Sequence, residues 1–190
     1  CGNLANGSPI GDSLPAMLAL DAVLYLRRGE ATRALPIDRF YLDYRRTALE
    51  RGEFVEAVWV PPRAAADLVA SYKVARRHDQ DISAVSATFR IRREAGRVAE
   101  ARLAFGGMAA TARRAAAAER ALTCAPWTLE SIRQAQVALA EDFAPLTDLR
   151  ASSEYRLAVA RALLERCLRE SLGEPVRLPD MPVETGQAPR

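Results

Sequence analysis

Six segments of the chain have the short alternating or apolar patterns that predict β-strands. They span residues 22–28, 31–36, 53–60, 67–76, 82–93 and 97–107. Gly29-Glu30 lies between the first two segments and Ala95-Gly96 between the last two, and a two-residue spacing with glycine is typical of a β-hairpin. Pro61-Pro62 follows the third segment and is the best candidate for a domain boundary.

Helical periodicity dominates the part of the chain that follows the last strand. We expect three helices there, capped by Thr111, by Thr128, and by Ser152 or Ser153, with Gly173 ending the third. A short helix is also expected near residue 13, where Asp12 or Ser13 suits the N-cap and Pro15 the first turn. In the last helix the spacing predicts two opposite faces. The apolar face is formed by Leu157, Ala160, Leu164, Cys167 and Leu168. The polar face is formed by Arg156, Arg161, Glu165 and Arg169.

The order of these elements, strands before helices, predicts an α+β fold in which helices pack on one face of an antiparallel sheet. Residues 37–49 are expected to be irregular or briefly helical. We divide the chain into a first domain at 1–61, a second domain at 62–172 and a disordered tail at 173–190, where prolines recur without periodicity.

Composition excludes several classes of protein. The net charge is +3, and 26 of the 27 basic residues are arginine, which is no nucleic-acid-binding excess. No apolar run reaches the length of about 20 residues that crosses a bilayer. Three cysteines without a CxxC spacing form neither a zinc nor an iron-sulfur site, and they fit a reducing cytoplasm.

Polar chemistry is concentrated in two segments. CGNLANGSPIGD, residues 1–12, offers glycines and backbone amides that suit a phosphate or a polar heterocycle. On the pattern alone, an ordinary turn capped by Asp12 is the favoured interpretation. The second segment is SYKVARRHDQDISAV, residues 71–85, which contains the only lysine, Lys73. Its charged residues lie between two predicted strands, where a loop would project them into one cleft. The alternative interpretation is a solvated charged turn. The only histidine, His78, has no neighbouring ligand and is expected at the surface, so any catalysis depends on a cofactor.

Four ordered segments then show a family resemblance. GNLANGSPIGDSLPAMLALDA, FYLDYRRTALERGEFVEAVWVPP, SYKVARRHDQDISAVSATFRI and LAFGGMAATARRAAAAERAL resemble the FAD-binding part of xanthine dehydrogenases, which is the small subunit in two-subunit bacterial forms. The match runs from Cys1 to about Leu168. Other molybdenum hydroxylases share parts of it, and YRRTAL and RRHDQDISAV favour the xanthine enzyme.

The resemblance implies a fold and a function. The fold would be the end of a PCMH-type FAD-binding domain, followed by a three-stranded antiparallel sheet packed with three helices, as in the C-terminal domain of CO dehydrogenase flavoproteins. The chain would be the C-terminal portion of a longer protein, inactive alone. FAD would relay electrons to NAD from 2Fe-2S clusters and a molybdopterin site elsewhere, during oxidation of hypoxanthine or xanthine to urate. The partners would be a molybdopterin-binding large subunit and the upstream iron-sulfur and FAD segment, in a heterotetramer.

The resemblance also implies residue roles. Cys1, Gly2, Asn3, Asn6, Asp12, Val55 and Lys73 fall on positions that contact FAD. Tyr44, Arg77 and Asp79 fall on the nicotinamide side. Lys73 would place a fixed cation beside the flavin, where it stabilises the negative charge gained on reduction. No residue of this chain is expected to be catalytic or to bind a metal.

Two alternatives remain open at this point. One is the flavoprotein subunit of another molybdenum hydroxylase, oxidising carbon monoxide or an aldehyde. The other is a noncatalytic interaction domain, the remnant of a flavin site. The choice between NAD and oxygen as acceptor is also open.

Overall fold

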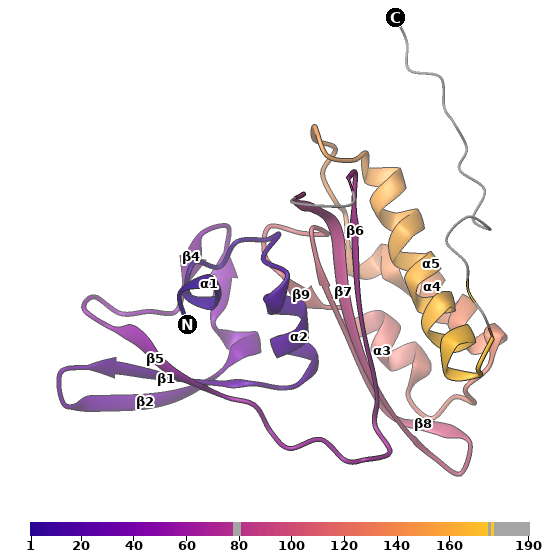
Figure 1. Ribbon diagram of the computed structural model, residues 1–190, viewed down its shortest axis with the longest axis horizontal. Coiled ribbons are helices and arrows are strands. Elements are labelled where there is room, and N and C mark those ends of the chain that lie inside the picture. Colours follow the sequence, from indigo (N-terminus) through magenta and orange to yellow (C-terminus); the bar gives the residue numbers. More distant parts are fainter. Residues whose placement is uncertain (78–80, 175, 177–190) are drawn as a thin grey trace, which may run out of the picture.

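The computed structural model describes residues 1–77, 81–174 and 176 and consists of two lobes that lie side by side (Figure 1). The first lobe, residues 1–60, contains one three-stranded sheet in the order β2-β1-β5 and a small β3-β4 hairpin. Its elements are α1 (Gly2–Ala5), α2 (Ser13–Ala19), β1 (Val23–Arg28), β2 (Ala31–Pro36), the 3-10 helix η1 (Ile37–Arg39), β3 (Tyr41–Asp43), β4 (Arg46–Thr47) and β5 (Phe54–Trp59).

The second lobe, residues 68–174, is built on an antiparallel sheet in the order β6-β7-β8-β9. Its strands are β6 (Leu68–Ala75), β7 (Ser83–Glu94), β8 (Arg97–Gly106) and β9 (Arg113–Arg114), and its helices are α3 (Ala116–Leu122), α4 (Leu129–Asp142) and α5 (Ser153–Ser171). The three helices cover one face of this sheet, and α2 of the first lobe lies on the other (Figure 1). The predicted α+β class and the six predicted strands are confirmed, and β9 adds a short fourth strand to the expected three.

Alternation along the strands produces two hydrophobic cores. One face of β7 and β8 directs Phe89, Leu103 and Phe105 toward α3–α5, where Phe105 meets Phe143 edge to face at 5.4 Å. The opposite face is more polar and carries Ser86, Thr88 and other hydroxyl or charged residues. The sheet therefore presents an apolar surface to its own helices and a polar surface to the first lobe.

The predicted start of α3 at Thr111 is wrong. Arg113 and Arg114 pair with β8 as β9, and the helix begins at Ala116. The N–H groups of Ala117 and Ala118 donate to the carboxylate of Asp142, at 2.8 and 3.0 Å. Because a residue 25 positions away supplies the cap, no local motif marks this helix start.

The last helix follows the prediction at both ends but not on its polar face. Ser152 Oγ accepts from the N–H of Tyr155 at 3.2 Å, and Gly173 ends the helix with a φ of +77°. Arg156, expected among the solvent-facing residues, is only 3% exposed. Its guanidinium donates to backbone carbonyls and to a carboxylate, which replace water around the buried charge.

Other expectations concern the ends of the chain and one loop. The first polar segment is helical at Gly2–Ala5, whereas residues 37–49 form η1, β3 and β4. The predicted tail lies outside the described residues, except for Gly173, Glu174 and Val176. The predicted site residue Asp79 also lies outside them. Within the part of the chain that the structure describes, no helix has the length and apolarity needed to span a membrane.

Asp21, directly after α2, joins the two lobes through arginines of the second. Its carboxylate lies 2.5 Å from Arg90 Nη2, 3.1 Å from Arg102 Nε and 3.6 Å from Arg114 Nη1. Asp21 has a φ of +52°, a left-handed conformation that aspartate tolerates better than most residues. Glu100 pairs with Arg90 and Arg102, so the anions and cations form one network at the lobe junction.

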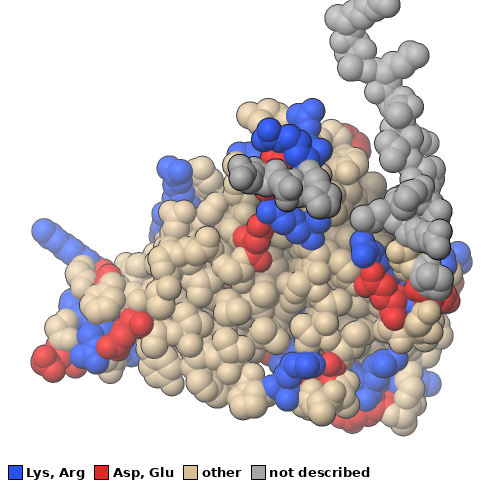
Figure 2. Space-filling model, viewed as in Figure 1, with Lys and Arg blue, Asp and Glu red and all other residues tan. Residues whose placement is uncertain are grey.

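Ion pairs also hold the first lobe together. Figure 2 shows basic and acidic side chains side by side at its left edge, where the β1-β2 hairpin lies. Arg33 Nε and Nη2 each donate to Glu53 at 2.7 Å, and the Glu53 side chain is only 6% exposed. The hydrogen bond from Arg33, supported by the N–H of Glu50, lowers the pKa of Glu53 to about 2. The ionised carboxylate is therefore a stabilising element of this lobe.

We expect the stability difference between the wild-type chain and Glu53→Gln to disappear in acid. Above the ordinary pKa of glutamate, about 4.3, the ion pair contributes in full, and its contribution is lost as the pH falls toward 2. Urea unfolding between pH 7 and pH 2 measures this difference, with Glu30→Gln at the exposed hairpin turn as control. A difference that is independent of pH would contradict the role of the ionised group.

Candidate functional site

The two polar segments meet where the start of α2 faces β6. Lys73 Nζ of β6 donates to Asp12 Oδ2 at 2.8 Å, and Ser83 Oγ of β7 donates to Asp12 Oδ1. The Lys73 and Asp12 side chains are each 47% exposed, whereas Ser83 is buried. Asp12 is the N-cap residue of α2, as predicted, but among the described residues its side chain makes no cap bond to the helix. Its two oxygens are used by the second lobe instead.

Cys1, Gly2 and Asn3 lie at the exposed start of α1. Asn3 Oδ1 accepts from Ser13 Oγ at 2.6 Å, which fixes α1 against the first turn of α2. A Cβ built on Gly2 has no described atom within 4 Å, so the main chain here is open to close approach. The first-turn N–H groups of a helix have no intrahelical acceptor, and at Gly2 and Asn3 they are available to a ligand.

Val55 lies behind α1 rather than at its surface. It pairs with Leu26 of β1, is 7% exposed, and belongs to the same core cluster as Leu4. Arg77 lies at the end of β6, where its N–H and guanidinium contact Asp81 at 2.8 and 3.7 Å. The structure thus brings Asp12 and Lys73 into direct contact and ties Asn3 to the same end of α2 through Ser13, whereas Val55 belongs to the core behind α1.

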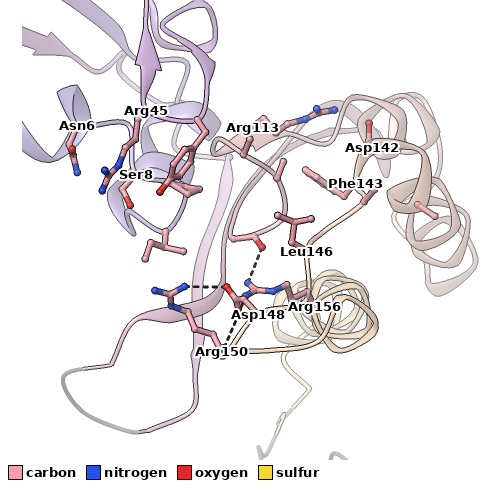
Figure 3. Close-up of a pocket in the computed structure, with 18 of the residues that line it drawn as sticks. Asn6, Ser8, Arg45, Arg113, Asp142, Phe143, Leu146, Asp148, Arg150 and Arg156 are labelled. Carbon is pink, nitrogen blue, oxygen red and sulfur yellow. Dashed lines mark hydrogen bonds and ion pairs between the residues drawn. The ribbon is translucent and has the colours of Figure 1, made fainter.

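A cleft of about 940 Å³ opens between the lobes on the other side of the 1–12 loop (Figure 3). Asn6, Ser8 and Ile10 line one wall, with Tyr44 and Arg45 from the β3-β4 turn. The second lobe supplies the opposite wall from the segment after β8, the end of α4 and the segment before α5. Of the predicted site residues, Asn6 and Tyr44 line this cleft, whereas Arg77 lies outside its described lining.

Both guanidinium groups and carboxylates line the cleft: Arg45, Arg113, Arg150, Arg156, and Glu141, Asp142, Asp148. Arg45 lies 5.6 Å from the ring centre of Tyr44, and Arg113 lies 5.6 Å from that of Phe143. Arg150 pairs with Asp148 at 3.1 Å. Three cations from three separate segments form a surface suited to phosphate or carboxylate groups.

Arg156 closes the base of this cleft. Its guanidinium donates to the carbonyls of Ala84 and Gly107 and, at 2.7 Å, to Asp148 Oδ1. Burial acts to raise the pKa of Asp148. Hydrogen bonds from the N–H groups of Arg150 and Ala151 and from the Arg156 guanidinium have the larger, opposite effect, so the pKa of Asp148 is lowered to about 2. Arg156 therefore links β7, the turn after β8 and the segment before α5.

Sequence reasoning missed Ser83, Arg156 and the cleft arginines. The burial of Arg156 was detectable in the sequence, because this residue precedes Ala160 by four positions and Leu164 by eight. That spacing places it on the apolar face of the helix. No such pattern marked Ser83, since its orientation depends on an irregularity in the pairing of β6 with β7. The cleft arginines are distant in sequence and come together only through the fold.

Comparison with known families identifies the chain. The family described as the CO dehydrogenase flavoprotein C-terminal domain matches residues 70–171, more than half of the sequence. The chain belongs to this flavoprotein family. A second family, described as the FAD binding domain in molybdopterin dehydrogenase, matches residues 1–63 of this flavoprotein chain.

Individual relatives of the flavoprotein chain point to more than one enzyme. It is 31% identical over 172 residues to the xanthine dehydrogenase FAD-binding subunit of Escherichia coli O157:H7, covering 90% of this chain and 59% of the relative. It is 41% identical over 115 residues to the nicotinate hydroxylase of Emericella nidulans, covering 58% of this chain and 8% of the relative. A solved structure of carbon monoxide dehydrogenase from Hydrogenophaga pseudoflava, lacking the Mo-pyranopterin moiety, matches with a TM-score of 0.84 and 31% identity, covering 90% of this chain and 60% of that one. The chain thus spans about three fifths of two of these relatives.

Proposed function

We propose that this chain is part of the FAD-binding subunit of a xanthine dehydrogenase, in which bound FAD takes up two electrons and passes them as hydride to NAD. The observation that carries the proposal is the ion pair of Lys73, the only lysine, with Asp12, whose neighbour Ser13 donates to Asn3 at the open start of α1. The relatives named for FAD and xanthine support it.

The residues present fit a flavin dinucleotide. The open main chain at Gly2 permits close contact with a flat or phosphorylated ligand, because no side chain intervenes. The half-exposed Lys73 ammonium is positioned to stabilise negative charge gained by such a ligand. Cys1, Asn3, Asp12 and the core residue Val55 would complete or support this side of the site.

The arginine-lined cleft suits the acceptor. Arg45, Arg113 and Arg150 would bind the phosphates of NAD, and Tyr44 would offer its ring to a base. Asn6 lies on the same loop as Asp12, so the flavin and the nicotinamide would meet along this loop, in the direct contact that hydride transfer requires. The family resemblance assigns Arg77 and Asp79 to the nicotinamide side as well.

The proposed assembly contains this subunit, its iron-sulfur segment and a molybdopterin-binding large subunit, as a heterotetramer. Its visible absorption spectrum tests the cofactor assignment, because flavin and iron-sulfur bands are expected together. Oxidation of hypoxanthine and xanthine with NAD tests the substrate and acceptor assignments. A complex that lacks flavin would refute the FAD-binding function.

We expect Lys73→Gln to make the flavin potential about 30–60 mV more negative, a 10- to 100-fold loss in the two-electron equilibrium. Loss of the ammonium removes the fixed charge that favours the reduced cofactor. A redox titration of the complete complex measures the shift. Arg120→Gln removes one exposed positive charge from α3, on the far side of the sheet, and is the control. Equal potentials in the two variants would exclude this role of Lys73.

A carbon monoxide dehydrogenase is the second candidate. The identity to that solved structure, 31%, equals the identity to the xanthine dehydrogenase subunit. Turnover of carbon monoxide in place of purines by the complete complex would establish it, with the same role for FAD.

A further inference from the structure

The Ser83 hydroxyl donates a hydrogen bond to the carboxylate of the Asp12–Lys73 pair. Asp12 has two acceptor oxygens, and each is bound by a different strand: Oδ2 by Lys73 of β6 and Oδ1 by Ser83 of β7. Ser83 is 2% exposed, whereas both members of the ion pair are about half exposed. A buried donor thus fixes one oxygen of a carboxylate that would otherwise be free to rotate in solvent.

A bulge in the sheet aims Ser83 at this carboxylate. Val74 pairs with Val85, but Ala75 pairs with Ser83, so Ala84 is the extra residue of β7. Such a bulge changes which face the next paired side chain, here the one before the extra residue, occupies. Ser83 consequently shares a face with Lys73 and Ser86, which pair directly. The Ala84 carbonyl accepts from the buried Arg156, which holds the bulge in place.

We infer that Ser83 is a positioning residue that sets how much of the Lys73 charge is available to a bound flavin. While Ser83 holds Oδ1, Asp12 offers a single oxygen to the ammonium. Without that hydroxyl, both oxygens turn toward Lys73 and screen it more strongly. The effect on a flavin rests on the proposed function, whereas the effect on Lys73 itself does not.

Ser83→Ala in the complete complex tests the inference, and the chain provides a matched control. Ser86 lies on the same face of the same strand, is also buried, and its hydroxyl has no hydrogen-bond partner among the described residues. Ser86→Ala therefore removes an equivalent hydroxyl without touching Asp12. Both variants are compared with the wild-type complex in two measurements.

The first measurement is the rate at which an amine reagent labels Lys73, followed by mass spectrometry of its peptide. In Ser83→Ala we expect labelling about fivefold slower, the factor that one ordinary hydrogen bond contributes. The second measurement is the flavin potential, for which a fivefold change in the two-electron equilibrium is a shift of about 20 mV to more negative values. Ser86→Ala is expected to match the wild type in both.

The outcomes separate this inference from the proposed function. Slower labelling together with a more negative potential supports the positioning role. Labelling of Ser83→Ala at the wild-type rate or faster overturns it, whatever the flavin content. If the complex contains no flavin, the proposed function fails, and the labelling rate alone decides the role of Ser83.

Discussion

Replacing Gly107 by alanine is expected to lower the free energy of unfolding by about 2–4 kcal/mol. Gly107 has a φ of +79°, where an L-residue costs about 1–2 kcal/mol. A Cβ here would also collide with the Ala84 carbonyl and lie 3.1 Å from Arg156 Nη1, and such overpacking typically costs about 1–3 kcal/mol. Urea denaturation of both proteins measures the difference.

Gly29→Ala isolates the backbone contribution. Gly29 has a φ of +58°, but a Cβ at this hairpin turn would have no described atom within 4 Å. We therefore expect a loss of only about 1–2 kcal/mol from this variant. If the two glycine variants lost the same stability, the close contact at the base of the cleft would have no energetic consequence.

Arg156→Ala is expected to destabilise the chain by about 3 kcal/mol. The substitution leaves the Ala84 and Gly107 carbonyls without their donor, and each buried unpaired acceptor costs about 1–3 kcal/mol. The ion pair with Asp148 adds little, because that carboxylate is 37% exposed and remains solvated. Denaturant unfolding again gives the value.

Arg161→Ala on the same helix is the comparison. Arg161 is exposed, and its Nε donates to the Gln136 carbonyl at 3.1 Å. Substitution at such a surface position is expected to change stability by no more than about 0.5 kcal/mol. Similar losses for the two arginines would mean that water replaces the buried donor without cost.

The strands and turns could be predicted from the sequence because their determinants are local. Alternation marked the six longer strands, and glycine marked the turns at Gly29 and Gly96, which both have positive φ. Helix starts at Thr128 and Ser152 were found because the capping side chains lie next to the helices they cap. These features require no knowledge of distant residues.

The errors arose where a distant residue decides the local structure. Asp142 caps α3 from another helix, which moved the helix start away from Thr111. Asp12 is the N-cap residue of α2, but its side chain binds Lys73 and Ser83 in the second lobe and makes no cap bond to the helix. Because arginine is abundant in this chain, the buried Arg156 could not be distinguished from solvated arginines by residue type alone.

The candidate site could be predicted only in part, for the same reason. The family resemblance supplied Lys73 and Asp12, and the structure places them in direct contact. The wall of the cleft contributed by Arg113 and Arg150 depends on how the helices pack on the sheet. No pattern within one segment indicates that packing.

The network around Asp21 limits how the molecule can respond to a ligand. Rotation of one lobe about the other would separate the Asp21 carboxylate from Arg90, Arg102 and Arg114. These guanidiniums are largely buried, and each would keep only its carboxylate partner within the second lobe, Glu100 or Glu119. A hinge at this junction is therefore energetically unfavourable. Any closure around an occupant must come from side chains and short connections at the rim, while the spacing between the lobes stays constant.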